Sequence, residues 1–135
     1  MAFWLFKEEP SSYSFSDLEK EGKTTWQGIK NALALQHLRK VRKGDKVFFY
    51  QTGKDRCIAG IALVVSDPIP DPSLEDPRLV VVEIKPNSRF PNPVTLETIK
   101  KDGLLQGWDL VRLPRLSVIP VNPEQWQRVL ELANV

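Results

Sequence analysis

The segment KVFFYQTGKDRCIAGIALVVS, residues 46–66, decides the fold class. Lys46–Tyr50 and Cys57–Ser66 are rich in the β-branched and aromatic residues that favour strands. Gly53-Lys54-Asp55 between them is typical of a turn. The segment therefore predicts two consecutive β-strands.

Further strands and helices are predicted on both sides of this segment. Strand-like patterns occur at residues 3–6, 79–84 and 116–121. Capping residues predict a helix from Ser16 to Gly22, one from Asn31 to about Lys43, and a C-terminal one after Asn122. A short helix is expected near 95–101, and the stretches 24–29 and 67–72 are expected to be loops. Five or six short strands with helices inserted between them predict an α+β fold, a partly closed mixed β-barrel with peripheral helices.

Length and composition predict one domain spanning residues 1–135. The hydrophobic fraction of 41% and the charged fraction of 27% argue against disorder. The single cysteine, Cys57, cannot form an internal disulfide, and no cysteine–histidine set occurs, so we expect neither metal nor cofactor. The apolar run 2–6 is too short for a signal peptide or a membrane span. We expect a cytoplasmic protein, or a nuclear one if the source has a nucleus.

The sequence holds no clear catalytic motif. It lacks a phosphate-binding glycine loop, a nucleophile elbow and a zinc signature. His37 lies in the middle of a predicted helix, without an indicated partner to orient it for acid–base catalysis. Cys57 is predicted to be a packing residue, and Glu8 and Glu9 should point to opposite faces of an extended chain. We therefore expect that the protein is not an enzyme.

The predicted helix after Asn31 has one apolar and one basic face. The net charge of +2 is small, so nucleic-acid binding would depend on a local patch of charge. Such a patch could contact phosphate, or it could be an ordinary solvated face. The predicted phosphate-binding residues are Lys7, Lys30, Arg39, Lys40 and Lys43.

Several motifs resemble one known family, and they occur in order along almost the whole chain. They are Trp4–Pro10, Trp26–Asn31, Lys43–Tyr50, Ile58–Ala62 and Arg115–Val121. Together they resemble the EVE domain of the thymocyte nuclear protein family and its small bacterial relatives. The chain departs from the family pattern at Asn31–Leu35, a plain apolar run where relatives commonly carry a longer basic-aromatic segment.

The resemblance implies a PUA-like fold, related to the YTH domain that reads methylated adenine in RNA. It also implies a pocket that accepts one flipped, often modified base, and EVE domains are associated with modified cytosine in DNA. By this resemblance Trp26 would be a stacking wall and Gln27 would supply hydrogen bonds. Residues after the first strand, among them Glu9, Ser12 and Tyr13, would read the edge of the base.

A pocket that reads a base needs an aromatic wall, polar groups and nearby cations. The sequence offers all three. Trp26 is expected in a loop beside Gly28, with its ring accessible; a Trp26 that only fills the core is the alternative. Of Phe49 and Tyr50 only one can face the pocket, and the hydroxyl favours Tyr50, with core packing as its alternative. The predicted base-binding residues are Glu9, Ser12, Tyr13, Trp26, Gln27, Gly28, Asn31 and Tyr50.

The expected function is therefore a non-enzymatic module that binds DNA or RNA carrying a modified base. The partner is nucleic acid, and no membrane is involved. The alternative is a protein that binds a free nucleobase, a nucleoside or an acidic metabolite in the same pocket. An enzyme acting on a nucleotide or RNA is a third, weaker possibility.

Overall fold

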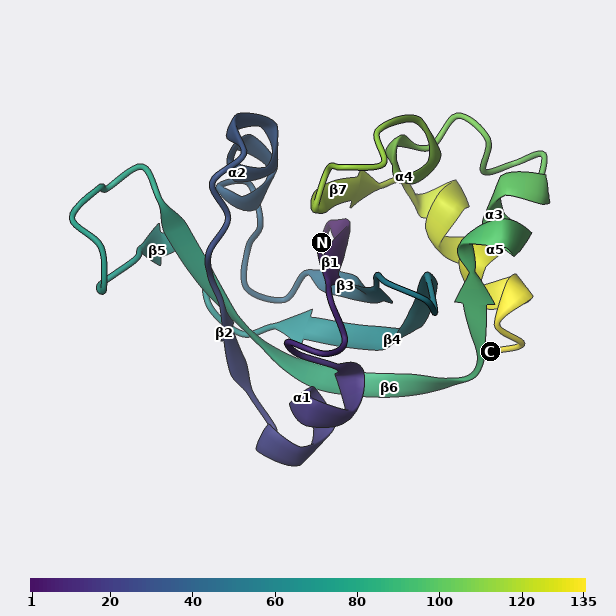
Figure 1. Ribbon diagram of the computed structural model, residues 1–135, viewed down its shortest axis with the longest axis horizontal. Helices are drawn as coiled ribbons and strands as arrows, with labels where there is room; N and C mark the ends of the chain where they lie inside the picture. The colour runs from purple at the N-terminus through teal and green to yellow at the C-terminus, as the bar shows by residue number, and fades with distance from the viewer.

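The computed structural model describes residues 1–135, and its centre is a strongly curled β-sheet (Figure 1). Six strands follow one another in the order β2-β6-β4-β3-β1-β7, and a short β5 pairs with β6. β1 and β3 are parallel, whereas the other neighbours are antiparallel. The predicted mixed, partly closed barrel is therefore confirmed as a half-barrel. The strands are β1 Phe3–Glu8, β2 Thr24–Trp26, β3 Lys46–Gln51, β4 Cys57–Val64, β5 Ile69–Pro70, β6 Val80–Thr95 and β7 Val118–Val121.

The helices lie around this sheet, as predicted. In Figure 1, α3, α4 and α5 gather near the end of the long strand β6, whereas α1 and α2 lie apart from them. No helix combines the length and the hydrophobicity that crossing a membrane requires. The helices are α1 Phe15–Glu21, α2 Ala32–Leu38, α3 Leu96–Lys101, α4 Asp109–Arg112 and α5 Pro123–Leu132.

The start of α1 corrects a prediction. Its N-cap is Ser14, two residues before the expected Ser16. The Ser14 hydroxyl accepts a hydrogen bond from the Asp17 amide at 3.1 Å, and the Asp17 carboxylate accepts one from the Ser14 amide at 2.9 Å. This reciprocal pair satisfies two amides at the helix start and therefore sets its position. Gly22, with φ +79°, ends the helix as expected.

Helix α2 begins as predicted but ends early. The Asn31 side chain accepts a hydrogen bond from the Ala34 amide at 3.0 Å. The helix stops at Leu38 and does not reach Lys43. After Leu38 the amides of Lys40 and Val41 bond carbonyls three residues back. Two carboxylates take the amides that follow, since Asp45 accepts from the Arg42 amide at 2.9 Å and Asp67 accepts from the Lys43 amide at 2.8 Å. These amides are thereby removed from a continuing helix.

Strand β2 lies where a loop was predicted, and strand β6 is longer than the sequence pattern suggested. Residues 24–26 form a strand paired with β6, not a loop. The strand predicted at 79–84 continues to Thr95 through three prolines. Pro91 and Pro93 fall between Arg89 and Val94, where pairing with β4 is interrupted by a bulge, so no ladder hydrogen bond from them is needed. The expected loop 67–72 also contributes the two-residue β5.

The core joins the sheet to the C-terminal helix. Asn122 and Gln125 form the predicted capping box of α5, with hydrogen bonds of 2.7 and 2.9 Å. Trp126 on this helix is buried and stacks on Phe48 of β3, with ring centroids 3.8 Å apart. Trp126 stacks on Phe3 of β1 as well, at 4.4 Å. The predicted docking of α5 is therefore confirmed.

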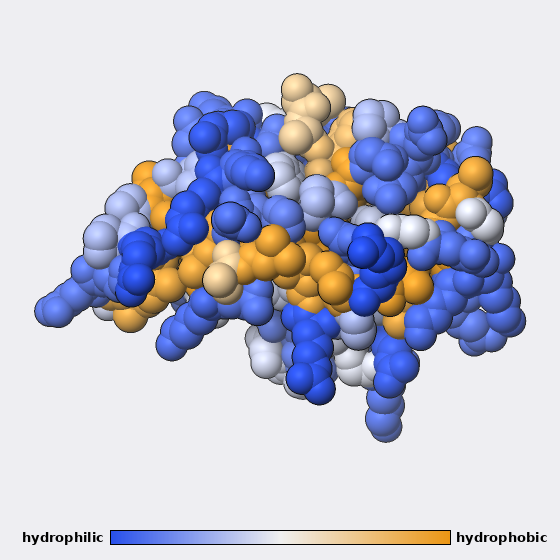
Figure 2. Space-filling model, turned by 90° about the horizontal axis from the view of Figure 1, so that it is seen from above, coloured by the Kyte–Doolittle hydropathy of each residue, from blue (hydrophilic) through white to orange (hydrophobic).

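The surface carries both hydrophilic and hydrophobic side chains. Seen from above, hydrophilic residues surround a band of hydrophobic ones (Figure 2). The large hydrophobic residues that are exposed come from separate segments, for example Leu33, Ile69 and Leu104. Exposed apolar side chains of this kind are ordinary on folded proteins.

Candidate functional site

A pocket of about 170 Å³ opens beside Trp26, where β1 ends and β2 leads into the next turn. β1 contributes its last residue, β2 contributes all three of its residues, and Tyr13 comes from the segment between β1 and α1. For comparison, an engineered cavity of about 150 Å³ holds benzene, so the volume suits one planar ring. The lining residues are Glu8, Tyr13, Thr24, Thr25, Trp26 and Gln27.

Trp26 is both a wall of this pocket and part of the core. It is the last residue of β2, not a loop residue, and its side chain is only 5% exposed. Its ring lies 5.4 Å from that of Phe6 and 5.6 Å from that of Phe49. The indole Nε1 is buried and has no hydrogen-bond partner in the protein. The expectation of an openly presented indole is therefore corrected: most of the ring is fixed by the core, and the pocket lies beside it.

Glu8 and Tyr13 supply the ionisable groups of the pocket. The Glu8 carboxylate accepts a hydrogen bond from the amide of Glu9 at 2.9 Å. The Tyr13 hydroxyl donates to the Glu21 carboxylate, and burial together with this bond raises the pKa of Tyr13 to about 12. Tyr13 is therefore uncharged at neutral pH. No lysine or arginine lines this pocket.

Glu9 does not line the pocket; its neighbour Glu8 does. The Glu9 carboxylate instead accepts hydrogen bonds from the hydroxyls of Ser11 and Thr52, both at 3.3 Å. Glu8 lies on the same face of β1 as Phe6, because side chains two apart on a strand share a face, and Phe6 contacts Trp26 in the folded protein.

Of the other predicted base-binding residues, some line the pocket and some lie outside it. Gln27 is exposed and lines the pocket, and Gly28 follows with φ +81°, a backbone conformation suited to glycine. Asn31 uses its side chain to cap α2. Ser12 is exposed in the turn after β1, and its amide donates to the Glu9 carbonyl at 2.9 Å. The structure thus brings Tyr13, Trp26 and Gln27 together, but not Ser12 or Asn31.

Tyr50 also lies outside this pocket. Phe49, its neighbour in β3, is the residue that contacts Trp26, and successive strand residues point to opposite faces. Tyr50 is buried in a different pocket, where the ammonium of Lys7 lies 5.5 Å from its ring centroid. The structure therefore places Tyr50, which was expected to face the base pocket, on the other side of β3 from Trp26.

The predicted phosphate-binding residues fall into two groups. Lys30, Lys40 and Lys43 are exposed near α2, and their ammonium groups form no ion pair. Arg39 is also exposed, but it donates to the carbonyl of Arg78 at 2.6 Å. Lys7 lies elsewhere, beside Tyr50, and donates to the carbonyl of Pro114 at 2.9 Å.

The histidine and the cysteine take up structural positions. His37 is partly buried in α2 near the ring of Trp4, and burial together with Lys40 lowers the pKa of its imidazole. Cys57 is 6% exposed, and burial raises the pKa of its thiol, which disfavours the reactive thiolate. No three histidine, cysteine or acidic side chains come together in a way that could hold a metal ion.

Comparison with known proteins places this arrangement in a family. Residues 2–132 match the EVE domain family. Mouse thymocyte nuclear protein 1 is 28% identical in an alignment of 164 positions, gaps included, that covers 96% of this chain and 73% of the mouse protein. A protein from Rhodopseudomonas palustris solved by NMR is 34% identical, with a TM-score of 0.95 over 99% of this chain and 94% of its own.

One further relative was solved with a ligand. The human THYN1 protein, in complex with DNA containing 5-methylcytosine, is 25% identical and has a TM-score of 0.91. The similarity covers 100% of this chain and 99% of the human one. The family match, the agreement of fold and the coverage of nearly all residues lead to one conclusion: this chain belongs to the EVE domain family.

Proposed function

We propose that this protein binds DNA or RNA and holds one flipped base in the pocket beside Trp26. The observation that carries the proposal is the pocket itself, which has room for one planar ring between aromatic and polar side chains. Base readers commonly combine an aromatic surface with groups that bond the Watson–Crick edge. Binding without catalysis is the activity that these groups support best.

Glu8 gives the pocket a chemical preference. Its carboxylate accepts hydrogen bonds, as a cytosine N4 amino group or an adenine N6 amino group requires. Thymine presents an oxygen at the corresponding position, which a carboxylate repels. Because the pocket carries this negative group and no cation, it suits an uncharged base with an amino group and disfavours a phosphate.

A modified cytosine is the base we propose, because the human THYN1 protein was crystallised with DNA containing 5-methylcytosine. Extruding a base from a duplex costs a few kcal/mol. Trp26 is only 5% exposed, so stacking on it returns less than the roughly 1–3 kcal/mol that a free aromatic face gives. A methyl group that adds contacts in the pocket could therefore decide whether the base is held.

The proposal is tested by replacing Glu8. We expect Glu8→Ala to weaken binding of a single-stranded oligonucleotide containing 5-methylcytosine by about tenfold, the scale of one good contact to a base edge. Fluorescence anisotropy against matched oligonucleotides with cytosine, 5-methylcytosine or thymine would measure the change. Glu124→Ala is the control, since Glu124 is an exposed carboxylate on α5, outside the pocket. Equal affinity of the protein for all three oligonucleotides would contradict base reading.

A second candidate is a protein that binds a free nucleobase or nucleoside. The observation that favours it is the absence of cations from the lining of the pocket, since an uncharged ligand needs none. This candidate predicts affinity for 5-methylcytidine that depends little on ionic strength. Binding of nucleic acid should instead weaken steeply as salt is added.

A further inference from the structure

Two adjoining pockets lie away from Trp26, beside Tyr50 and α3, and they share Arg56, Leu96 and Lys100. Their volumes are about 300 and 460 Å³. Five cations and two carboxylates line them, an excess of three positive charges, which is more than the +2 of the whole chain. The charged residues are Lys7, Lys54, Arg56, Lys100 and Lys101, with Asp55 and Glu97.

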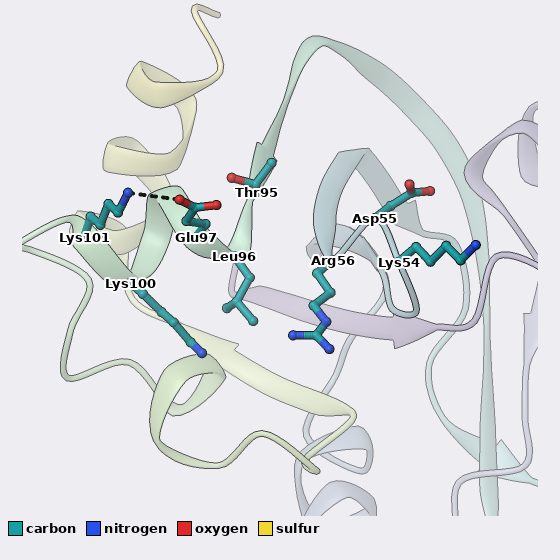
Figure 3. Close-up of a pocket in the computed structure, with 8 residues that line it drawn as sticks. All are labelled: Lys54, Asp55, Arg56, Thr95, Leu96, Glu97, Lys100 and Lys101. Atoms are coloured by element: carbon teal, nitrogen blue, oxygen red, sulfur yellow. Dashed lines mark hydrogen bonds and ion pairs between the residues drawn. The ribbon is translucent and has the colours of Figure 1, made fainter.

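Most of these cations have no carboxylate partner. Glu97 is occupied by Lys101, at 3.0 Å. Arg56 donates only to the carbonyl of Gly53, at 3.3 Å, and Lys100 forms neither a hydrogen bond nor an ion pair. In Figure 3, Arg56 and Lys100 extend on either side of Leu96 toward the same space, whereas Asp55 points away. Cations in excess over the nearby carboxylates repel one another, and an anion between them would relieve this repulsion.

Tyr50 adds a neutral donor to the same place. The residue is 3% exposed and lines the pocket together with Lys7, and its hydroxyl takes part in no hydrogen bond within the protein. Burial raises the pKa of Tyr50 to about 12, so the hydroxyl keeps its proton at neutral pH. A hydroxyl that is not bonded within the protein is available to a ligand.

The backbone at Arg56 is unusual. Its φ of +40° lies in the left-handed region, which non-glycine residues rarely adopt and which is enriched at binding sites. The Arg56 carbonyl is held by the amide of Leu96 at 2.7 Å. This bond ties the turn before β4, which carries Arg56, to the start of α3, which carries Lys100.

We infer that this basic pocket binds a phosphate group, with Lys7, Arg56 and Lys100 as its cations and the Tyr50 hydroxyl as a further donor. Guanidinium and ammonium groups form short, strong hydrogen bonds to phosphate oxygens. A free phosphate compound and the backbone of a nucleic acid offer the same chemistry. The site goes beyond the proposed base pocket and does not depend on it, because Lys7 and Tyr50 face away from Phe6 and Phe49, the residues that contact Trp26.

The test is an NMR titration of the whole protein with inorganic phosphate at constant ionic strength, and separately with an unmodified single-stranded oligonucleotide. We expect saturable shifts of the amides of Gly53, Arg56 and Lys100. The double variant Arg56→Gln, Lys100→Glu should weaken phosphate binding at least about tenfold. Lys20→Glu is the control for added negative charge, because Lys20 is exposed on α1, outside these pockets.

The two probes distinguish the sources of the phosphate group. Saturation by both supports a contact to the nucleic-acid backbone, and saturation by inorganic phosphate alone supports a small anionic ligand. Inorganic phosphate carries no base, so failure of the base pocket would not be mistaken for failure of this site. Absence of saturable shifts with either probe at low salt, or shifts that persist in the double variant, would overturn the inference.

Discussion

The rings of Trp26 and Phe49 meet edge to face, with their centroids 5.6 Å apart and their planes at 79°. Such aromatic pairs contribute about 0.5–1.5 kcal/mol beyond the burial of their surfaces. Phe49 is fully buried in β3, at the centre of the sheet. The wall of the proposed base pocket is therefore also a core contact, and a change at Trp26 affects folding as well as binding.

Trp26→Ala is expected to destabilise the protein by about 3–5 kcal/mol, the usual cost of removing a buried tryptophan. Equilibrium unfolding in guanidinium chloride would measure the loss. Trp26→Phe should cost less, because it keeps an aromatic ring against Phe6 and Phe49. A Trp26→Ala variant as stable as the parent would show that the ring is not held by the core.

Gly60 in β4 should not tolerate a side chain. A Cβ built there would lie 2.5 Å from the carbonyl oxygen of Ser88 and 2.8 Å from the ring of Phe15. We expect Gly60→Ala to lower the free energy of unfolding by at least ~1–3 kcal/mol, since packed atoms would have to move. Gly107→Ala is the matched control, because nothing lies within 4 Å of its added Cβ. Equal thermal unfolding of the two variants would contradict this packing.

The sequence allowed most of the fold to be predicted, because local chemistry decided it. Strands β1, β3 and β4 follow their β-branched and aromatic runs, and α5 follows its capping box. The errors arose where distant residues decide the outcome. α2 does not reach Lys43 because Asp45 and Asp67 bind the amides of Arg42 and Lys43, and Thr24–Trp26 becomes a strand because β6 lies beside it.

The candidate site was predicted only in part for the same reason. Tyr13, Trp26 and Gln27, which were expected to share a pocket, line one, and their contact with a base stays a prediction. Glu8 was missed because the sequence did not show which face of β1 contacts Trp26. Arg56 and Lys100 are 44 positions apart and meet only because β6 carries α3 back to the start of β4, an arrangement that no local pattern reveals.

Asp45 should be important for stability, because it connects three separate groups. This carboxylate is 4% exposed and accepts hydrogen bonds from the Ala2 amide, the Trp4 indole and the Arg42 amide, each at 2.9 Å. Leaving a buried donor unpaired costs about 1–3 kcal/mol, so we expect Asp45→Ala to cost at least ~3 kcal/mol by urea unfolding. Glu75→Ala, at an exposed loop position, is the control. A loss no larger than that of the control would contradict these bonds.

Both tyrosines of the chain should titrate well above their ordinary pKa of 10. Burial is the main cause that raises the pKa of Tyr13 and of Tyr50 to about 12. Between pH 10 and 12 the folded protein therefore keeps protons that the unfolded chain releases, and stability should fall as the pH rises through this range. Near-ultraviolet absorbance would follow the phenolates. A titration midpoint near pH 10 in the folded protein would contradict the burial of the two tyrosines. The double variant Tyr13→Phe, Tyr50→Phe should lose the fall in stability between pH 10 and 12.

The lysines near α2 provide a separate test of the predicted phosphate contacts. Lys30, Lys40 and Lys43 are exposed and unpaired. If each contacts a phosphate of duplex DNA, each change to alanine should weaken binding of every sequence alike and reduce the slope of log K against log salt by about 0.9. Arg112→Ala is the control, because Arg112 is held by Asp109 at 3.3 Å. An unchanged slope in the triple alanine variant would show that the duplex lies elsewhere, and the pocket of Lys7, Arg56 and Lys100 would then be the next surface to test.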